Sequence, residues 1–245
     1  MLKNNLKAWS EELQLIRTIT SNILRWKSSG NNQRSCTLLP WKMQGCQNFW
    51  KPLGILELGK LYDLPDLEDL THYYFTKNVL RSSANPISDA DHLIAYPVLY
   101  FNTLRVSVQN HNTKDYTQHY LRCTGPKAFR GKEKRADWVW VRRAIGKDQQ
   151  PSGLNGKIPA RLNTVFRLRG PKGIFRLAHV TMTKCVGSPT PSGEEGMVRV
   201  KWGNNAVVKI IDIEGMAHLI NIDEGLWLVN NRIELDTWEN IHDGQ

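Results

Sequence analysis

The sequence predicts an α+β fold: a helical N-terminal part followed by a β-rich C-terminal part with a small barrel of the SH3-like or BAH-like (bromo-adjacent-homology) kind. Two observations predict this fold. Apolar residues recur at helical spacing in the first third of the chain, and β-branched and aromatic runs separated by turns dominate after Ile94. We expect three parts: 1–35 as an amphipathic helix and polar linker, 36–95 as a short helical region, and 96–245 as a β-rich basic domain with the small C-terminal barrel.

The N-terminal arm, residues 2–26, is predicted to form an amphipathic helix. Its apolar residues recur at three- and four-residue steps from Leu2 to Ile23, and charged residues such as Glu12 fall largely off that face. Such a face packs on its own domain or pairs with another subunit, so self-association through this helix is one expected interaction. The polar stretch 28–35 predicts a linker after it.

Two short helices are predicted between Leu53 and Leu70, where leucines recur about every third residue and Pro65 interrupts them. The second should begin near Asp63 to Asp66, because acidic residues suit a helix N-terminus. A further helical segment is predicted over about 67–82, ending at the Ser-Ser-Ala-Asn-Pro turn at 82–86.

Strands are predicted where β-branched and aromatic residues cluster, over 96–108, 116–123, 137–143, 162–169, 174–186, 196–202, 206–213 and 226–230. The sequence Gly170-Pro171-Lys172-Gly173 predicts a turn between the strands at 162–169 and 174–186. Gly203-Asn204-Asn205 predicts a tight hairpin between the strands at 196–202 and 206–213.

The formal net charge is +10 and the sequence pI is about 9.5, which predicts attraction to polyanions such as nucleic acid, an anionic membrane or an acidic protein. The charge is unevenly distributed. Residues 120–176 hold fifteen Lys and Arg against three acids, whereas the chain from Gly203 onward holds eight acids and two bases. A uniformly solvated surface would not divide in this way.

The basic segment also contains aromatic residues. Cations neutralise phosphates and release their counterions, and aromatic rings can stack on unpaired bases. We therefore predict a polyanion-binding groove made by Arg130, Lys132, Lys134, Arg135, Trp138, Trp140, Arg142, Arg143, Arg161, Arg167 and Arg169. In the competing interpretation Trp138 and Trp140 fill the core, and the basic side chains are solvated and partly neutralised by the acidic C-terminal third.

No catalytic site, metal site or cofactor is predicted. The four cysteines form no CxxC pair and no Cys/His group with zinc spacing, and the histidines are scattered singly. Phosphate-loop, HExxH and GxSxG motifs are missing. A magnesium-dependent nuclease is the weakest alternative: Asp66 and Asp69 could share a helix face, but the sequence supplies no third ligand beside them.

The expected location is intracellular, with the nucleus favoured over the cytoplasm. The first 30 residues offer no secretory signal, and no apolar run approaches the ~20 residues of a membrane span. The sequence Lys-Glu-Lys-Arg at 132–135 could serve as a nuclear address. No membrane interaction is expected.

The chain also resembles the C-terminal region of fungal proteins related to the Plavaka-type, CACTA-like transposase group, over roughly 60–242. The resemblance lies in RCTGPKAFR (122–130), KRADWVWVR (134–142), LNGKIPARLN (154–163), RLAHV (176–180), GMVRV (196–200), GMAHLI (215–220) and WLVNNRIELDTW (227–238). It implies transposon ancestry. Such transposases carry an acidic nuclease core and a zinc-binding segment, and because this chain has neither pattern, the resemblance implies no catalytic residue.

Three functions therefore compete. The first is a non-catalytic, transposon-derived module that binds DNA or another polyanion through the basic middle segment. The second is a chromatin or protein-peptide module of the small-barrel type, in which Trp202 or Trp227, with Asp223 or Glu224, forms a cage for a methylated lysine. The third is a transposase remnant without activity.

Overall fold

The computed structural model describes residues 41–46, 53–109, 116–124, 135–142, 154, 156–170, 173–186 and 198–229. The chain divides into two compact units, Met1–Leu39 and Pro40–Gln245, and all described residues belong to the second. The predicted amphipathic helix at 2–26 and the linker at 28–35 lie outside the described residues.

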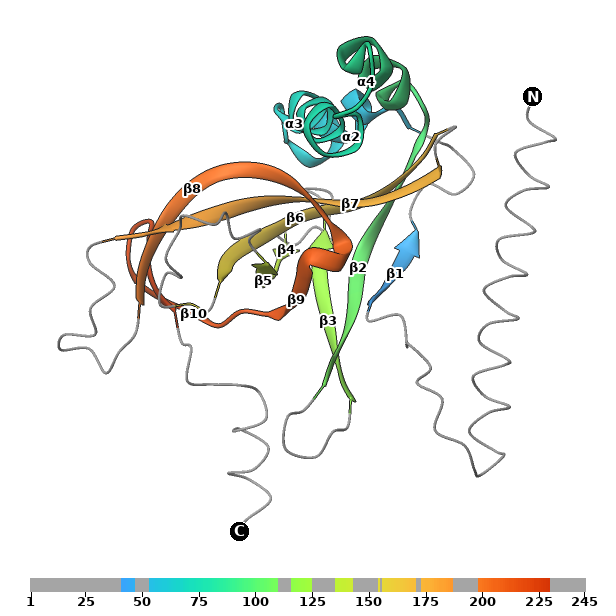
Figure 1. Ribbon diagram of the computed structural model, residues 1–245. Coiled ribbons are helices and arrows are strands. Elements are labelled where there is room, and N and C mark those ends of the chain that lie inside the picture. The colour runs from blue at the N-terminus through green and yellow to red at the C-terminus, as the bar shows by residue number, and fades with distance from the viewer. Residues whose placement is uncertain are drawn as a thin grey trace, which may run out of the picture. The chain divides into compact units, whose positions relative to one another are not determined.

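The described part is mostly antiparallel β-sheet, curled into a half-barrel (Figure 1). Its strands are β1 (Trp41–Cys46), β2 (Val98–Gln109), β3 (Tyr116–Thr124), β4 (Arg135–Ala136), β5 (Trp138–Arg142), β6 (Lys157–Gly170), β7 (Gly173–Cys185), β8 (Val198–Lys209), β9 (Ile213–Met216), β10 (Leu219–Asp223) and β11 (Leu226–Val229). The order across the sheet is β10-β11-β8-β7-β6-β2-β3-β4. In addition, β1 pairs with β2, and β5 pairs with β6 and β9.

Short helices lie over one side of this sheet (Figure 1). They are α2 (Ile55–Tyr62), α3 (Leu67–Tyr74), the π-helical turn η1 (Phe75–Val79) and α4 (Pro86–Ile94); a 3₁₀ turn, η3 (Ile210–Asp212), follows β8. The start of α3 is confirmed, with Asp66 as its N-cap residue. The sequence did not predict α4, which begins at Pro86, where the fixed φ angle of proline suits the first turn of a helix.

The predicted fold class is wrong in its layout, although its β-rich part is confirmed. Within the described residues, the helices do not precede the sheet, and no separate SH3-like or BAH-like barrel follows them. β1 lies inside the region expected to be helical and pairs with β2, so the helices interrupt a sheet instead of preceding one. The predicted C-terminal barrel is replaced by long strands of 12 to 14 residues that continue into the single sheet.

The hairpin predicted at Gly203 is also wrong, whereas the one at Gly170 is confirmed. Gly170 pairs with Gly173 and closes the β6–β7 hairpin. Gly203 instead lies inside β8, where the pairing with β7 shifts between Thr181 and Thr183. A Cβ atom on Gly203 would stand only 3.0 Å from the Met182 carbonyl oxygen. The glycine therefore permits a bulge with close backbone approach, which the sequence pattern does not distinguish from a turn.

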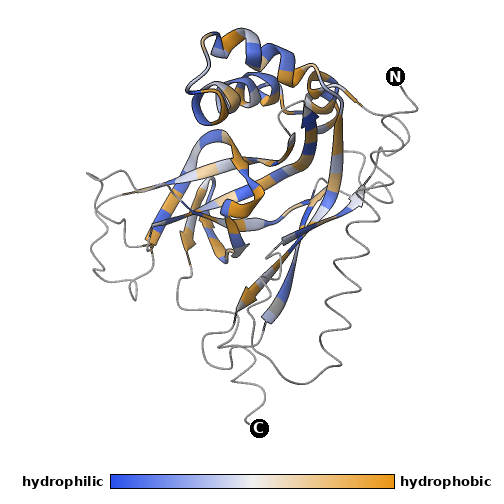
Figure 2. Cartoon of the chain, turned by 45° about the vertical axis from the view of Figure 1, so that its right-hand side comes forward, coloured by the Kyte–Doolittle hydropathy of each residue, from blue (hydrophilic) through white to orange (hydrophobic). Residues whose placement is uncertain are grey.

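The main core lies between the helices and the sheet. Leu58, Leu67 and Phe75 from the helical layer pack with Phe166 and Leu177 from β6 and β7, and all five are almost fully buried. Each such side chain contributes roughly 2 kcal/mol through burial. Hydrophobic and hydrophilic residues alternate along the strands (Figure 2), as expected when the two faces of a sheet differ in exposure.

Candidate nucleic-acid interface

The charges are separated between the layers of the fold. Strands β1 to β8 contain fourteen Lys and Arg and no Asp or Glu, and the first strand acid is Glu214 in β9. The helical region, residues 53–97, contains seven acids and three bases. Since the helices cover only one side of the sheet, the positive charge belongs to the sheet and the negative charge to the layer above it.

Three strands at one end of the fold bring cations and exposed aromatic rings to one face. In the pairing of β1, β2 and β3, Lys42 lies opposite Arg105 and Arg105 opposite Tyr120. Residues directly opposite each other point to the same side of a sheet. The β1–β2–β3 face, as we name this surface, consists of Lys42, Gln44, Thr103, Arg105, Ser107, Tyr116, Gln118, Tyr120 and Arg122.

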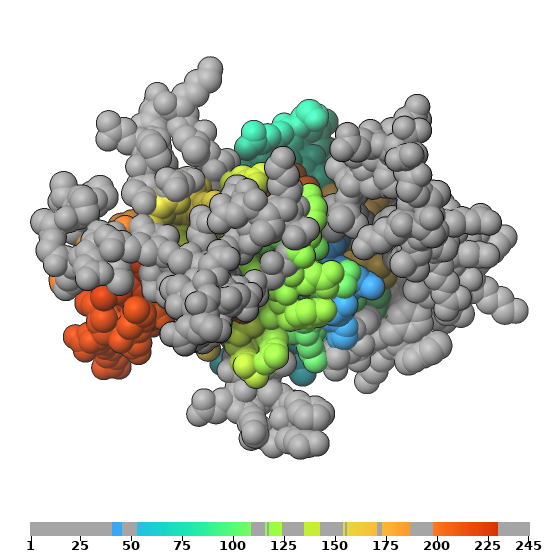
Figure 3. Space-filling view, turned by 90° about the horizontal axis from the view of Figure 1, so that it is seen from below, coloured from blue at the N-terminus to red at the C-terminus, as the bar shows by residue number. Residues whose placement is uncertain are grey.

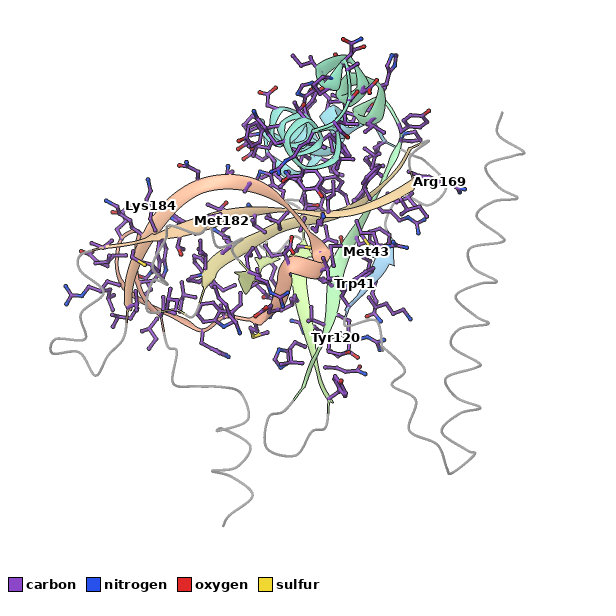
Figure 4. The ribbon with its side chains drawn as sticks, in the orientation of Figure 1. Trp41, Met43, Tyr120, Arg169, Met182 and Lys184 are labelled. Atoms are coloured by element: carbon purple, nitrogen blue, oxygen red, sulfur yellow. The ribbon has the colours of Figure 1, made fainter. Side chains whose placement is uncertain are left out.

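The other side of these three strands is largely apolar, and its centre is buried. Leu104 lies opposite Met43 and Leu121, and both leucines are fully buried. A register shift by one residue would expose them, so their burial fixes which side chains the strands present outward. β1, β2 and β3 lie side by side at the surface in Figure 3, and Figure 4 labels Tyr120 on the part of β3 away from α2–α4.

Polar contacts organise the centre of the β1–β2–β3 face. Arg105 Nη1 donates to Gln118 Oε1 at 3.2 Å, and the Tyr120 hydroxyl donates to the same oxygen at 3.3 Å. The backbone N–H of Arg122 donates to Asp137 Oδ2 at 2.7 Å. Within the described part of the chain, the side chains of Arg105, Arg122 and Lys42 form no ion pair. Their charge therefore remains available to an external anion.

Those residues of the predicted groove that the structure describes do not gather in one place. Arg130, Lys132, Lys134 and Arg143 lie outside the described residues. Arg135 is exposed on β4. The others are distributed along β5 and β6, with Arg142 and Lys157 opposite each other at one end and Arg167 near the other. Ten residues of strand separate Lys157 from Arg167, which corresponds to about 30 Å.

At the end of β6 where Arg142 lies opposite Lys157, an acid from the C-terminal third of the chain neutralises both cations. Glu214 Oε1 lies 2.5 Å from Arg142 Nη2, and its Oε2 lies 2.8 Å from Lys157 Nζ. Partial burial favours a raised pKa for the Glu214 carboxyl, but hydrogen bonds from Lys157 and Arg142 outweigh it and hold the pKa below its usual value. Arg142 is therefore committed to an internal ion pair, as the solvated-surface interpretation predicted.

At the other end of β6, arginines lie close together near the β6–β7 hairpin. Arg167 lies opposite Arg176, two residues from Arg169, and the Arg176 guanidinium stands over the Trp41 ring at 5.3 Å. The Nη1 atom of Arg169 is buried and makes no hydrogen bond. Figure 4 labels Arg169 at this end and Lys184 at the opposite end of β7. Arg161, half-buried, lies between the two ends and pairs with Trp138.

The tryptophans pack on one another instead of lining a groove. The ring centroids of Trp138, Trp202 and Trp227 lie 4.4 to 5.4 Å apart, and Trp140 packs against the same small core cluster. In an aromatic cage the cation lies over the face of each ring, within about 6 Å of its centroid, so the rings must leave room for it between them. These rings fill that space themselves, so the cage expected at Trp202 or Trp227 is not open in this conformation.

A buried polar network occupies the residues that could otherwise suggest catalysis. Fully buried His179 lies 3.2 Å from Asp66 Oδ1 through Nε2 and 3.1 Å from Asn163 Nδ2 through Nδ1. Asn205 Nδ2 donates to Asp66 Oδ2 at 2.7 Å. Because the Asn163 amide nitrogen can only donate, His179 Nδ1 accepts and Nε2 carries the proton. Both ring nitrogens are engaged, so this histidine ties α3 to the sheet.

No group of three or more His, Cys, Asp or Glu in the described part of the chain lies close enough to hold a metal ion. The free thiol of Cys123 is buried, which raises its pKa to about 12. A thiol with that pKa is a poor nucleophile at neutral pH.

Sequence reasoning missed most of the β1–β2–β3 face. It identified the strand at 116–123 but did not use the alternation within it, where Tyr116, Gln118, Tyr120 and Arg122 point outward and Leu121 inward. That alternation was visible in the sequence. The contribution of Lys42 was not visible, because it depends on the pairing of β1 with β2 across more than 50 residues.

Comparison with known proteins identified no relative: no family model, curated protein or solved structure matches the chain. The resemblance to transposase-related proteins therefore stays a prediction. None of the helices that the structure describes combines the length and apolar character needed to cross a membrane.

Proposed function

We propose that the protein is a non-catalytic module that binds nucleic acid through the β1–β2–β3 face. The observation that supports it is the segregation of charge, with fourteen bases and no acid in strands β1 to β8. A surface of one sign attracts the opposite one, and the phosphate backbone is the commonest extended polyanion that a cell offers.

This face is favoured over the predicted groove because its cations are not used internally. Arg142 is neutralised by Glu214, whereas Lys42, Arg105 and Arg122 form no ion pair among the described residues. Lys42 and Arg122 are exposed and Arg105 is half-buried. Lys42 lies directly opposite Arg105, at about 5 Å, and Arg122 is the diagonal neighbour of Arg105, at about 7–8 Å, so each cation has another within a Debye length of about 8 Å.

The test is binding of a fluorescent single-stranded oligonucleotide and a duplex at low salt. A triple variant, Lys42→Gln with Arg105→Gln and Arg122→Gln, should weaken binding of both about tenfold or more. The matched control, Lys184→Gln with Lys201→Gln and Lys209→Gln, removes the same charge from exposed lysines of β7 and β8 and should weaken it less. Equal losses in the two variants, or no binding by the wild type, would contradict the proposal.

A further inference from the structure

We infer that the β1–β2–β3 face takes single-stranded nucleic acid, with unpaired bases stacked on Tyr116 and Tyr120. This inference rests on the proposed function and specifies its ligand. Tyr116, the first residue of β3, is 52% exposed, and Tyr120, in the middle of that strand, is 47% exposed; both pair with β2. Scattered exposed aromatic side chains are ordinary, but these two share one face with three cations, and none of the residues of β1, β2 and β3 is an acid.

The spacing of the tyrosines selects unpaired bases. Tyr116 and Tyr120 are four residues apart on β3, which places them about 13 Å apart along the strand. Bases within a duplex follow one another at 3.4 Å and keep their faces covered by their neighbours. Two rings at this distance can therefore stack only on bases of a strand that has been splayed open, as sheet-based single-strand binders do.

The side chains around each ring supply the remaining contacts. Arg105 lies beside Tyr120 and Lys42 beside Arg105, so a cation stands next to the ring where the backbone of a stacked nucleotide would pass. Gln118 lies between the two tyrosines, and its Oε1 atom is held by Arg105 and Tyr120. Its Nε2 group then faces away from those donors and can donate to the edge of a base.

The experiment separates base stacking from charge. A single-stranded oligonucleotide is compared with an abasic strand of the same length, which keeps the phosphates and lacks the bases. The double variant Tyr116→Ser with Tyr120→Ser should lose about tenfold or more in affinity for the base-bearing strand and almost none for the abasic strand. The variant Tyr120→Phe keeps the ring and should keep most of the affinity.

The control is Tyr73→Ser, which removes a 60% exposed tyrosine from α3 in the helical layer and should leave both affinities unchanged. Because all these tyrosines are exposed, their replacement should leave the fold intact, and the far-ultraviolet circular dichroism spectra of the variants should match that of the wild type. The inference is overturned if the double variant binds the base-bearing strand as the wild type does, or loses both strands equally. If the wild type binds neither strand, the proposed function itself fails.

Discussion

Replacing Asp66 by alanine should loosen the attachment of α3 to the sheet and destabilise the protein. Asp66 is the common acceptor for the His179 ring and the Asn205 amide, at 3.2 Å and 2.7 Å. Without it, the N–H of His179, which is 0% exposed, would lose its carboxylate acceptor. That loss costs about 1–3 kcal/mol, and loss of the half-buried Asn205 bond adds about 1 kcal/mol.

Removing the carboxylate also removes its own desolvation penalty, but that gain is small, because the Asp66 side chain is 35% exposed and only partly desolvated. No helix cap is lost either, since the Asp66 side chain makes no capping hydrogen bond. We therefore expect Asp66→Ala to lower the free energy of unfolding by about 2–4 kcal/mol, measured by urea unfolding followed by circular dichroism. That loss corresponds to a shift of about 1 M or more in the midpoint.

Asp69→Ala is the matched control, because Asp69 lies in the first turn of α3 and is exposed. It should change the unfolding free energy by less than about 0.5 kcal/mol. A loss below about 0.5 kcal/mol for Asp66→Ala, or equal losses for both variants, would refute the role assigned to the network.

Two further variants test the Glu214 ion pairs and the tryptophan cluster. Glu214→Gln should destabilise by about 1 kcal/mol at neutral pH, because its partners Arg142 and Lys157 are 63% and 43% exposed. Since the Glu214 pKa is lowered in the folded protein, the difference from wild type should vanish as acid titrates the wild-type carboxyl; a pH-independent difference in urea unfolding would contradict the ion pairs. Trp227→Ala should lower the unfolding free energy by about 3–5 kcal/mol, because it opens the tryptophan cluster. An unchanged stability with loss of methyl-lysine peptide binding would instead support the cage.

The local elements were largely predictable, and their arrangement was not. The strand at Trp138–Arg142 follows from the alternation of aromatic and β-branched residues, and the start of α3 follows from acidic residues after α2. These patterns depend on neighbours in the sequence. The pairing of β1 with β2 depends on residues more than 50 positions apart, for which no local pattern exists.

The candidate site shows the same division. The excess of positive charge in the middle of the chain was correctly counted, but the count could not show that Glu214 would neutralise Arg142. Nor could it show that Trp138 would stack on Trp202 from β8. Charge and aromatic content are properties of a sequence, whereas the face on which they meet is set by strand register.

Phosphate contact at the β1–β2–β3 face is tested most directly by the salt dependence of single-strand binding, measured for the wild type and for the Lys42→Gln, Arg105→Gln, Arg122→Gln variant. Each phosphate contact on a single strand contributes about 0.7 to the slope of log K against log salt, so losing three should reduce its magnitude by about 2. A slope that differs between the two proteins by this amount would support phosphate contacts at the β1–β2–β3 face. Identical slopes would show that these side chains touch no phosphate, and nucleic-acid binding through this face would then be wrong.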